Sequence, residues 1–190
     1  MPFEATGGEW NRILIAADLN GDDWQDLAIS SLGGLVIMLN TGNDGSSNWT
    51  GFGPATLYPS GTNPHCVASA DLDLDGDLDL LVSDYGEDGE ETGFYCFMNQ
   101  GDGSYGDSIL VNLGFDAHCI ALIGTDLDGD GDPEVCVLGY RPGAQNMIHC
   151  FDNIGVDEDG QWEGLAYSST LFLEFGACSI RDADFDLDGD

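Results

Sequence analysis

The stretch ADLDLDGDLD at residues 70–79 places aspartates at alternating positions of one short segment. Related phrases occur three more times, as ADLNGDDWQD at 17–26, TDLDGDGDPE at 125–134 and ADFDLDGD at 183–190. Their first aspartates are separated by 53, 55 and 58 residues and are Asp18, Asp71, Asp126 and Asp184. A near-constant period of this length predicts a repeat architecture.

Short apolar runs recur in the same order around each acidic phrase. In the second period, CVASA at 66–70 precedes the phrase, LLVS at 80–83 follows it, and FYCFMN at 94–99 ends in Asn. A Gly/Asp turn, an aromatic residue and a fourth run, SILVNL at 108–113, complete the period. Such runs, rich in branched and aromatic residues and bounded by Gly, Asp and Asn, predict strands rather than helices.

About four short strands in a repeat of this length match the size of one propeller blade. We therefore predict an all-β fold, a β-propeller of four-stranded blades, here a fragment of about three and a half blades. The small residues of the first strands suit a crowded position near a propeller axis. A stack of β-hairpins or a β-sandwich is the alternative, although it explains the regular acidic turns less well.

The predicted domain organisation is a single, incomplete β-propeller region over residues 1–190. The sequence stops inside its fourth acidic phrase, which suggests a piece of a longer array. The expected blades span roughly 10–60, 61–113, 114–174 and, truncated, 175–190.

The charge balance excludes some partners. The chain has 36 acidic and 3 basic residues, for a net charge of −33. Such a surface repels phosphate backbones and anionic lipids, so we expect no nucleic acid partner and no membrane insertion. No apolar run approaches the roughly 18 residues of a membrane span, and the opening MPFEATGGEW lacks the features of a signal peptide.

The acidic phrase has the pattern of a metal loop. In the second copy, carboxylates stand at positions 1, 3, 5 and 9, with Gly76 at position 6. Crowded carboxylates repel one another unless a cation lies among them, and hard oxygen ligands in a flexible loop suit Ca²⁺ better than Mg²⁺, zinc or copper. The loop is not an EF-hand, because position 12 is Ile29, Val82 or Val137 instead of Glu.

The pattern A-D-x-[DN]-x-D-G-x-x-D, followed by a strand and then by N-x-G-D-G-x-[FYW], resembles the FG-GAP/VCBS repeat family, as in integrin α-subunit heads and many secreted bacterial proteins. The resemblance implies propeller blades with a calcium loop in the first hairpin, about one Ca²⁺ per blade. The implied ligands are the oxygen-bearing side chains of the four loops: Asp18, Asn20, Asp22, Asp26, Asp71, Asp73, Asp75, Asp79, Asp126, Asp128, Asp130, Glu134, Asp184, Asp186 and Asp188. Two positions depart from the pattern, since Asp23 replaces the loop glycine and Glu134, after Pro133, replaces the closing Asp.

The cysteines and histidines give weaker signals. Each of the three histidines precedes a cysteine, in His65-Cys66, His118-Cys119 and His149-Cys150. Neighbouring strand residues point to opposite faces, so one dipeptide does not direct both side chains at one centre. The spacings 66–96 and 119–150 suggest a bridge within each blade, but first and third strands lie about 9.5 Å apart. That separation exceeds the bridging limit and favours buried thiols.

The leading functional hypothesis is a non-enzymatic, calcium-binding propeller module for extracellular adhesion or ligand binding. Its expected location is extracellular or at the cell surface, and its expected partner is an extracellular protein or glycan. The alternative is a propeller scaffold of a secreted glycan-active enzyme, such as a polysaccharide lyase or hydrolase. Adaptation to high salt would explain acidity, although not its concentration at loop positions 1, 3, 5 and 9.

Overall fold

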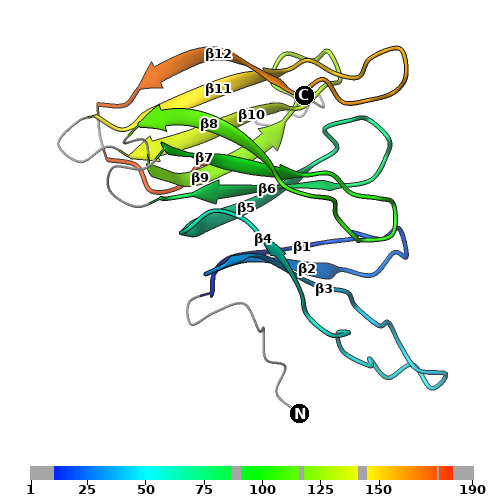
Figure 1. Ribbon diagram of the computed structural model, residues 1–190. Coiled ribbons are helices and arrows are strands. Elements are labelled where there is room, and N and C mark those ends of the chain that lie inside the picture. Colours follow the sequence, from blue (N-terminus) through cyan, green and yellow to red (C-terminus); the bar gives the residue numbers. More distant parts are fainter. Residues whose placement is uncertain (1–10, 87–90, 116–117, 141–144, 175, 182–190) are drawn as a thin grey trace.

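The computed structural model describes residues 11–86, 91–115, 118–140, 145–174 and 176–181. These residues form three four-stranded antiparallel sheets in chain order (Figure 1). The first blade contains β1 (Asn11–Ala17), β2 (Asp26–Ser31), β3 (Gly34–Met38) and β4 (Thr56–Pro59). The second contains β5 (Pro64–Ala70), β6 (Asp79–Asp84), β7 (Glu91–Phe97) and β8 (Ile109–Phe115). The third contains β9 (His118–Thr125), β10 (Glu134–Tyr140), β11 (Met147–Asn153) and β12 (Leu165–Phe172).

The predicted all-β class is confirmed, and the three sheets are consistent with propeller blades. Within each sheet the strands pair with their neighbours in sequence, so every blade is an up-and-down meander. The loop between the first and second strands is the acidic phrase, and the three acidic loops leave the same side of the molecule, at the right in Figure 1. The start of the fourth predicted repeat, at 182–190, lies outside the described residues.

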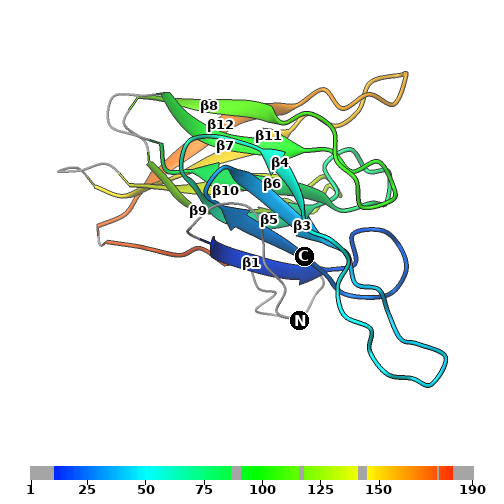
Figure 2. The ribbon, with the colours of Figure 1, turned by 60° about the horizontal axis from the view of Figure 1, so that its bottom comes forward.

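Apolar residues from facing sheets form the core between the blades, whose backbone arrangement Figure 2 shows from a second direction. Leu35 of the first blade packs in one buried cluster with Leu80 and Phe97 of the second. Phe94 of the second blade meets Phe151 of the third edge to face, with ring centroids 5.5 Å apart. Each sheet thus buries an apolar face on the next one, and burial of apolar area stabilises the contact at about 25 cal/mol per Å².

Small residues permit close approach at two points. A Cβ at Gly124 of β9 would lie 2.7 Å from the Cβ of Ala70 on β5, so the first strands of adjacent blades crowd one another. Gly34, at φ +144°, would place a Cβ 2.1 Å from the Tyr58 carbonyl oxygen on β4. A larger residue at either position would displace a neighbouring strand. Within the described ranges there is no helix long and apolar enough to cross a membrane.

Candidate metal sites in the acidic loops

The three acidic loops share one backbone conformation. The first aspartate of each loop accepts a hydrogen bond from the backbone N–H at position 6, at 2.7 Å from Asp23, 3.0 Å from Gly76 and 3.0 Å from Gly131. All three donors have positive φ, at 68°, 96° and 99°. Asp23 therefore adopts the left-handed conformation that its glycine counterparts adopt more readily, and Asp tolerates this region better than most residues.

The closing carboxylate at position 9 joins two strands of its blade. Asp79 is 1% exposed, and its Oδ2 accepts the Leu72 N–H at 2.9 Å while its Oδ1 accepts the Asn99 N–H at 2.7 Å. Asp26 makes the same pair of bonds with Leu19 and Asn40, at 2.9 and 2.6 Å. The closing residue thus ties the acidic loop to the end of the third strand. Sequence reasoning missed this role, although the Asn that ends each third strand was the available signal.

Three carboxylates converge in each of two loops. In the second-loop triad, one oxygen each of Asp71, Asp73 and Asp79 lies within 4.8 Å of the others. Asp73 Oδ1 is buried there and has no hydrogen-bond partner. An unpaired buried carboxylate oxygen beside two further carboxylates is unfavourable without a positive charge, so this donor set fits a hard cation.

The third-loop triad consists of Asp126, Asp128 and Glu134, whose oxygens also lie within 4.8 Å of one another. Glu134 Oε2 accepts the Leu127 N–H at 2.7 Å, which is the bond that Asp79 makes with Leu72. The longer Glu side chain therefore takes the place of Asp at position 9 and keeps the loop closed.

The buried carboxylates of the two triads hold protons more tightly than free carboxylic acids. Burial, with a smaller contribution from the charges of Asp73 and Asp75, raises the pKa of Asp79 to about 7 against the opposing effect of the N–H groups of Asn99 and Leu72. Burial also raises the pKa of Asp73 and of Glu134, and neighbouring aspartates add to both shifts. A bound divalent cation reverses this by stabilising the ionised forms.

The other predicted ligands lie outside the two triads. Asp75 and Asp130 are exposed, and each accepts the N–H of the residue two positions later, at 2.9 and 3.0 Å. In the first loop, Asn20 Nδ2 donates to Asp22 Oδ2 at 3.1 Å, while Asp18 and Asp26 accept backbone N–H groups. Asp184, Asp186 and Asp188 lie outside the described residues. The complete ligand sets stay predictions.

The acidic loops also support the neighbouring blade. Asn99 Nδ2, in the second blade, donates to the Leu19 carbonyl in the acidic loop of the first blade at 2.9 Å. Asn153 Nδ2, in the third blade, donates to the Leu72 carbonyl of the second at 2.8 Å. Each junction therefore has a hydrogen bond that ends on the second residue of a predicted calcium loop.

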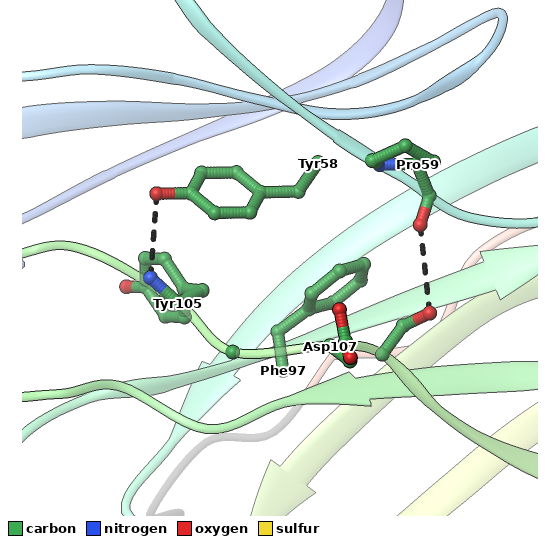
Figure 3. Close-up of a pocket in the computed structure, with 7 residues that line it drawn as sticks. Tyr58, Pro59, Phe97, Tyr105 and Asp107 are labelled. Atoms are coloured by element: carbon green, nitrogen blue, oxygen red, sulfur yellow. Dashed lines mark hydrogen bonds between the residues drawn. The ribbon is translucent and has the colours of Figure 1, made fainter.

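A pocket of about 660 Å³ lies between the first and second blades and is lined by aromatic and polar residues (Figure 3). Tyr58 meets Phe97 and Tyr105 edge to face, with ring centroids 6.4 and 5.7 Å away, and its hydroxyl accepts the Tyr105 N–H at 3.3 Å. The exposed Asp107 adds a carboxylate to the lining. Mixed apolar and hydrogen-bonding walls of this kind suit a small polar ligand. Sequence reasoning did not predict the pocket, because two blades build it together.

Two of the histidines take part in the junction between the second and third blades. His118 of β9 stacks on Tyr85 with ring centroids 4.2 Å apart, and His65 Nδ1 lies 3.0 Å from the Ile120 carbonyl oxygen. His149 is a third-blade residue that contacts Thr170 Oγ1 at 2.9 Å. Their dominant contacts are thus with aromatic rings, carbonyl oxygens and a hydroxyl group.

The fold and the loops together define a repeat protein of antiparallel blades with acidic, cation-compatible hairpin loops. Residues 6–82 match the family model of the FG-GAP-like repeat, which confirms the resemblance over this part of the chain.

Two known proteins show further similarity. A segment of 78 residues is 32% identical to the KICSTOR complex protein kaptin of Mus musculus and covers 40% of this chain and 17% of kaptin. A structure of an Agrocybe aegerita lectin, described as specifically recognising non-reducing terminal N-acetylglucosamine, superposes with a TM-score of 0.48 at 19% identity. That superposition covers 84% of this chain and 37% of the lectin chain, so this chain spans well under half the length of either protein.

Proposed function

We propose that the chain is a calcium-binding, non-enzymatic FG-GAP-type propeller module that presents binding surfaces to an extracellular protein or glycan. The observation that carries the calcium part is the second-loop triad, in which Asp73 Oδ1 is buried without a partner beside Asp71 and Asp79. One oxygen each of Asp71, Asp73 and Asp79 lies within 4.8 Å of the others, which gives the Asp73 carboxylate the surroundings of a hard-cation ligand. The match of residues 6–82 to the FG-GAP-like repeat supports the same assignment.

In this proposal the second-loop and third-loop triads supply carboxylate ligands, and Asp75 and Asp130 supply further ones from the same loops. The first loop contributes Asp18, Asn20, Asp22 and Asp26. The ion neutralises the crowded charges and stabilises the loop conformation, whose backbone carbonyl accepts the asparagine hydrogen bond from the next blade. Its role is therefore structural, and the pocket between the blades is the surface that we assign to a small polar group of the ligand.

An extracellular location agrees with this calcium chemistry. Calcium sites of extracellular modules bind in the range of about 10⁻⁴ to 10⁻³ M, so they are filled outside the cell. The net charge of −33 favours cation binding and disfavours nucleic acid as the partner.

Calorimetric titration with Ca²⁺ after chelation tests the proposal. We expect about three sites and a rise in Tm in millimolar Ca²⁺, because an ion that binds only the folded state stabilises it. Asp73→Asn should remove one site. Asp77→Asn is the matched control, since it makes the same charge change in the same loop outside the predicted ligand set. A Tm that is unchanged in millimolar Ca²⁺ would falsify the proposal.

The ligand part needs a separate measurement. Immobilised glycans and extracellular matrix proteins, screened with Ca²⁺ and again after chelation, should yield binding that weakens on chelation. Asp107→Ala, in the pocket lining, should reduce this binding without changing the calcium titration. Binding that persists unchanged in the Asp107→Ala variant would assign the ligand to another surface.

A further inference from the structure

Two cysteines of the third blade lie directly opposite each other on adjacent strands. Cys136 of β10 pairs in register with Cys150 of β11. Their sulfur atoms are 2.9 Å apart, with the Cys136 thiol donating to Cys150 Sγ. Directly opposite residues of an antiparallel pair have Cα atoms about 4.5–5.5 Å apart, which lies within the range that disulfides span.

The equivalent positions of the other blades hold apolar contacts. The same register positions pair Ala28 with Ile37 in the first blade and Leu81 with Cys96 in the second. These four side chains are at most 2% exposed, because the following blade covers them. In the third blade, Cys136 is 4% exposed and Cys150 is only half-buried, so a small oxidant has access to Cys150.

We propose that Cys136 and Cys150 form an oxidisable dithiol that closes to a cross-strand disulfide within the third blade, with a disulfide of the glutathione class as oxidant. The Cys150 thiolate attacks one sulfur of the oxidant and releases a thiol. The Cys136 thiolate then attacks Cys150 Sγ and releases the second thiol. Two protein thiols lose two protons and two electrons, and one disulfide oxidant is reduced to two thiols.

The order of attack follows from burial. Cys136 is only 4% exposed, so it is shielded from the oxidant and acts as the resolving partner. Cys150 is the more exposed of the two and therefore reacts first. After the mixed disulfide forms at Cys150, Cys136 lies directly opposite it, so closure to the protein disulfide is faster than reaction of Cys136 with a second oxidant molecule.

The other cysteines are less well placed. Cys66 on β5 and Cys96 on β7 are separated by β6, and Cys119 is fully buried on β9. Cys178 is exposed, so it reacts with the oxidant but as a single thiol. The cysteine pairings suggested by the spacings 66–96 and 119–150 both join a first strand to a third strand and skip the strand between them.

Equilibration of the folded chain with oxidised and reduced glutathione, followed by acid quenching, tests the proposal. Titratable thiols should fall from six to three, two through the Cys136–Cys150 disulfide and one through a mixed disulfide at Cys178, and mass spectrometry of peptides should show Cys136 linked to Cys150. Cys150→Ser should abolish this linkage, and Cys178→Ser should preserve it. In concentrated urea, where strand register is lost, the specific linkage should disappear.

The mapping of the unmodified chain keeps the test independent of how the variants fold. Six titratable thiols at an oxidising glutathione ratio would overturn the proposal. So would a product that is only glutathionylated at Cys150, or one whose cystine includes Cys178.

Discussion

Leu72 and Leu127 occupy the same position in two acidic loops, yet Leu72 is fully buried whereas Leu127 is 56% exposed. Leu19, their counterpart in the first loop, is 1% exposed. The difference arises from the following blade, which covers Leu19 and Leu72. At Leu127 the third blade therefore presents apolar surface that its counterparts bury, and Ile154 of the same blade is also 50% exposed.

We expect the isolated chain to self-associate through this surface. Sedimentation velocity should show a concentration-dependent shift to larger species, and Leu127→Ser should reduce it. Leu32→Ser is the control, because Leu32 is 40% exposed in the turn between β2 and β3. A compact monomer at every concentration would contradict an open array of blades.

The effect of Asp75→Ala on the free energy of unfolding should change sign between the calcium-bound and the calcium-free protein. With Ca²⁺ bound, loss of a ligand should lower the free energy of unfolding by about 1–3 kcal/mol. Without Ca²⁺, removal of one of several crowded negative charges should be neutral or mildly stabilising. Urea unfolding in both conditions measures the difference. The control is Asp102→Ala, in an exposed turn of the same blade, which should change the free energy of unfolding equally with and without Ca²⁺. If Asp75→Ala also has the same effect in both conditions, Asp75 is an ordinary loop residue and not a ligand.

The calcium-free protein should become more stable as the pH falls. The folded-state pKa of Asp79 is raised to about 7, above the unfolded value near 4, so the folded state binds the extra proton between these pH values. Stability from this proton is complete below about pH 4 and is lost as the pH rises through 7. Thermal melts of the chelated protein at a series of pH values should show Tm falling as the pH rises from about 4 to 7.

Two comparisons isolate the contribution of Asp79. Saturating Ca²⁺ should flatten or reverse the slope, because the ion competes with protons for the carboxylates. Asp79→Asn should weaken the slope in the chelated protein, whereas Asp44→Asn, at an exposed turn, should leave it unchanged. The same slope in the Asp79→Asn variant would assign the effect to other carboxylates, such as Asp73 and Glu134, whose pKa values are also raised.

Asn99→Ala should weaken the junction between the first and second blades. The substitution leaves the Leu19 and Leu78 carbonyls without the Asn99 amide, and loss of partners for buried polar groups costs about 1–3 kcal/mol. Denaturant unfolding measures the loss. Asn40→Ala is the matched control, since the Asn40 amide donates to Gln25 of its own blade. If both variants lose the same stability, the bond to Leu19 adds nothing to the junction.

The blade architecture could be predicted because its signals are local. The spacing of Asp18, Asp71 and Asp126 gives the repeat, and short apolar runs bounded by turn residues give the strands. Asp23 aligns with Gly76 in the repeat, and both residues have positive φ, at 68° and 96°.

The remaining features depend on register and packing. Cys136 and Cys150 face each other because of how β10 and β11 align, and spacing alone does not reveal that alignment. Asn99 and Leu19 are 80 residues apart and meet only when two blades stack. The carboxylate triads lie between these cases, since the pattern placed their residues in one loop and the fold selected which oxygens converge.

The hydrogen bonds that asparagine side chains make between the blades give the array a direction. In both described junctions the acceptor is the acidic loop of the earlier blade, and the donor is the Asn of the later one. A disturbance in the loop at Asp71–Asp79 therefore reaches the third blade through the Leu72 carbonyl. It also reaches the junction with the first blade, because Asp79 and Leu78 hold the Asn99 that donates to Leu19. A change in one acidic loop therefore weakens the hydrogen bond that holds the next blade in the chain.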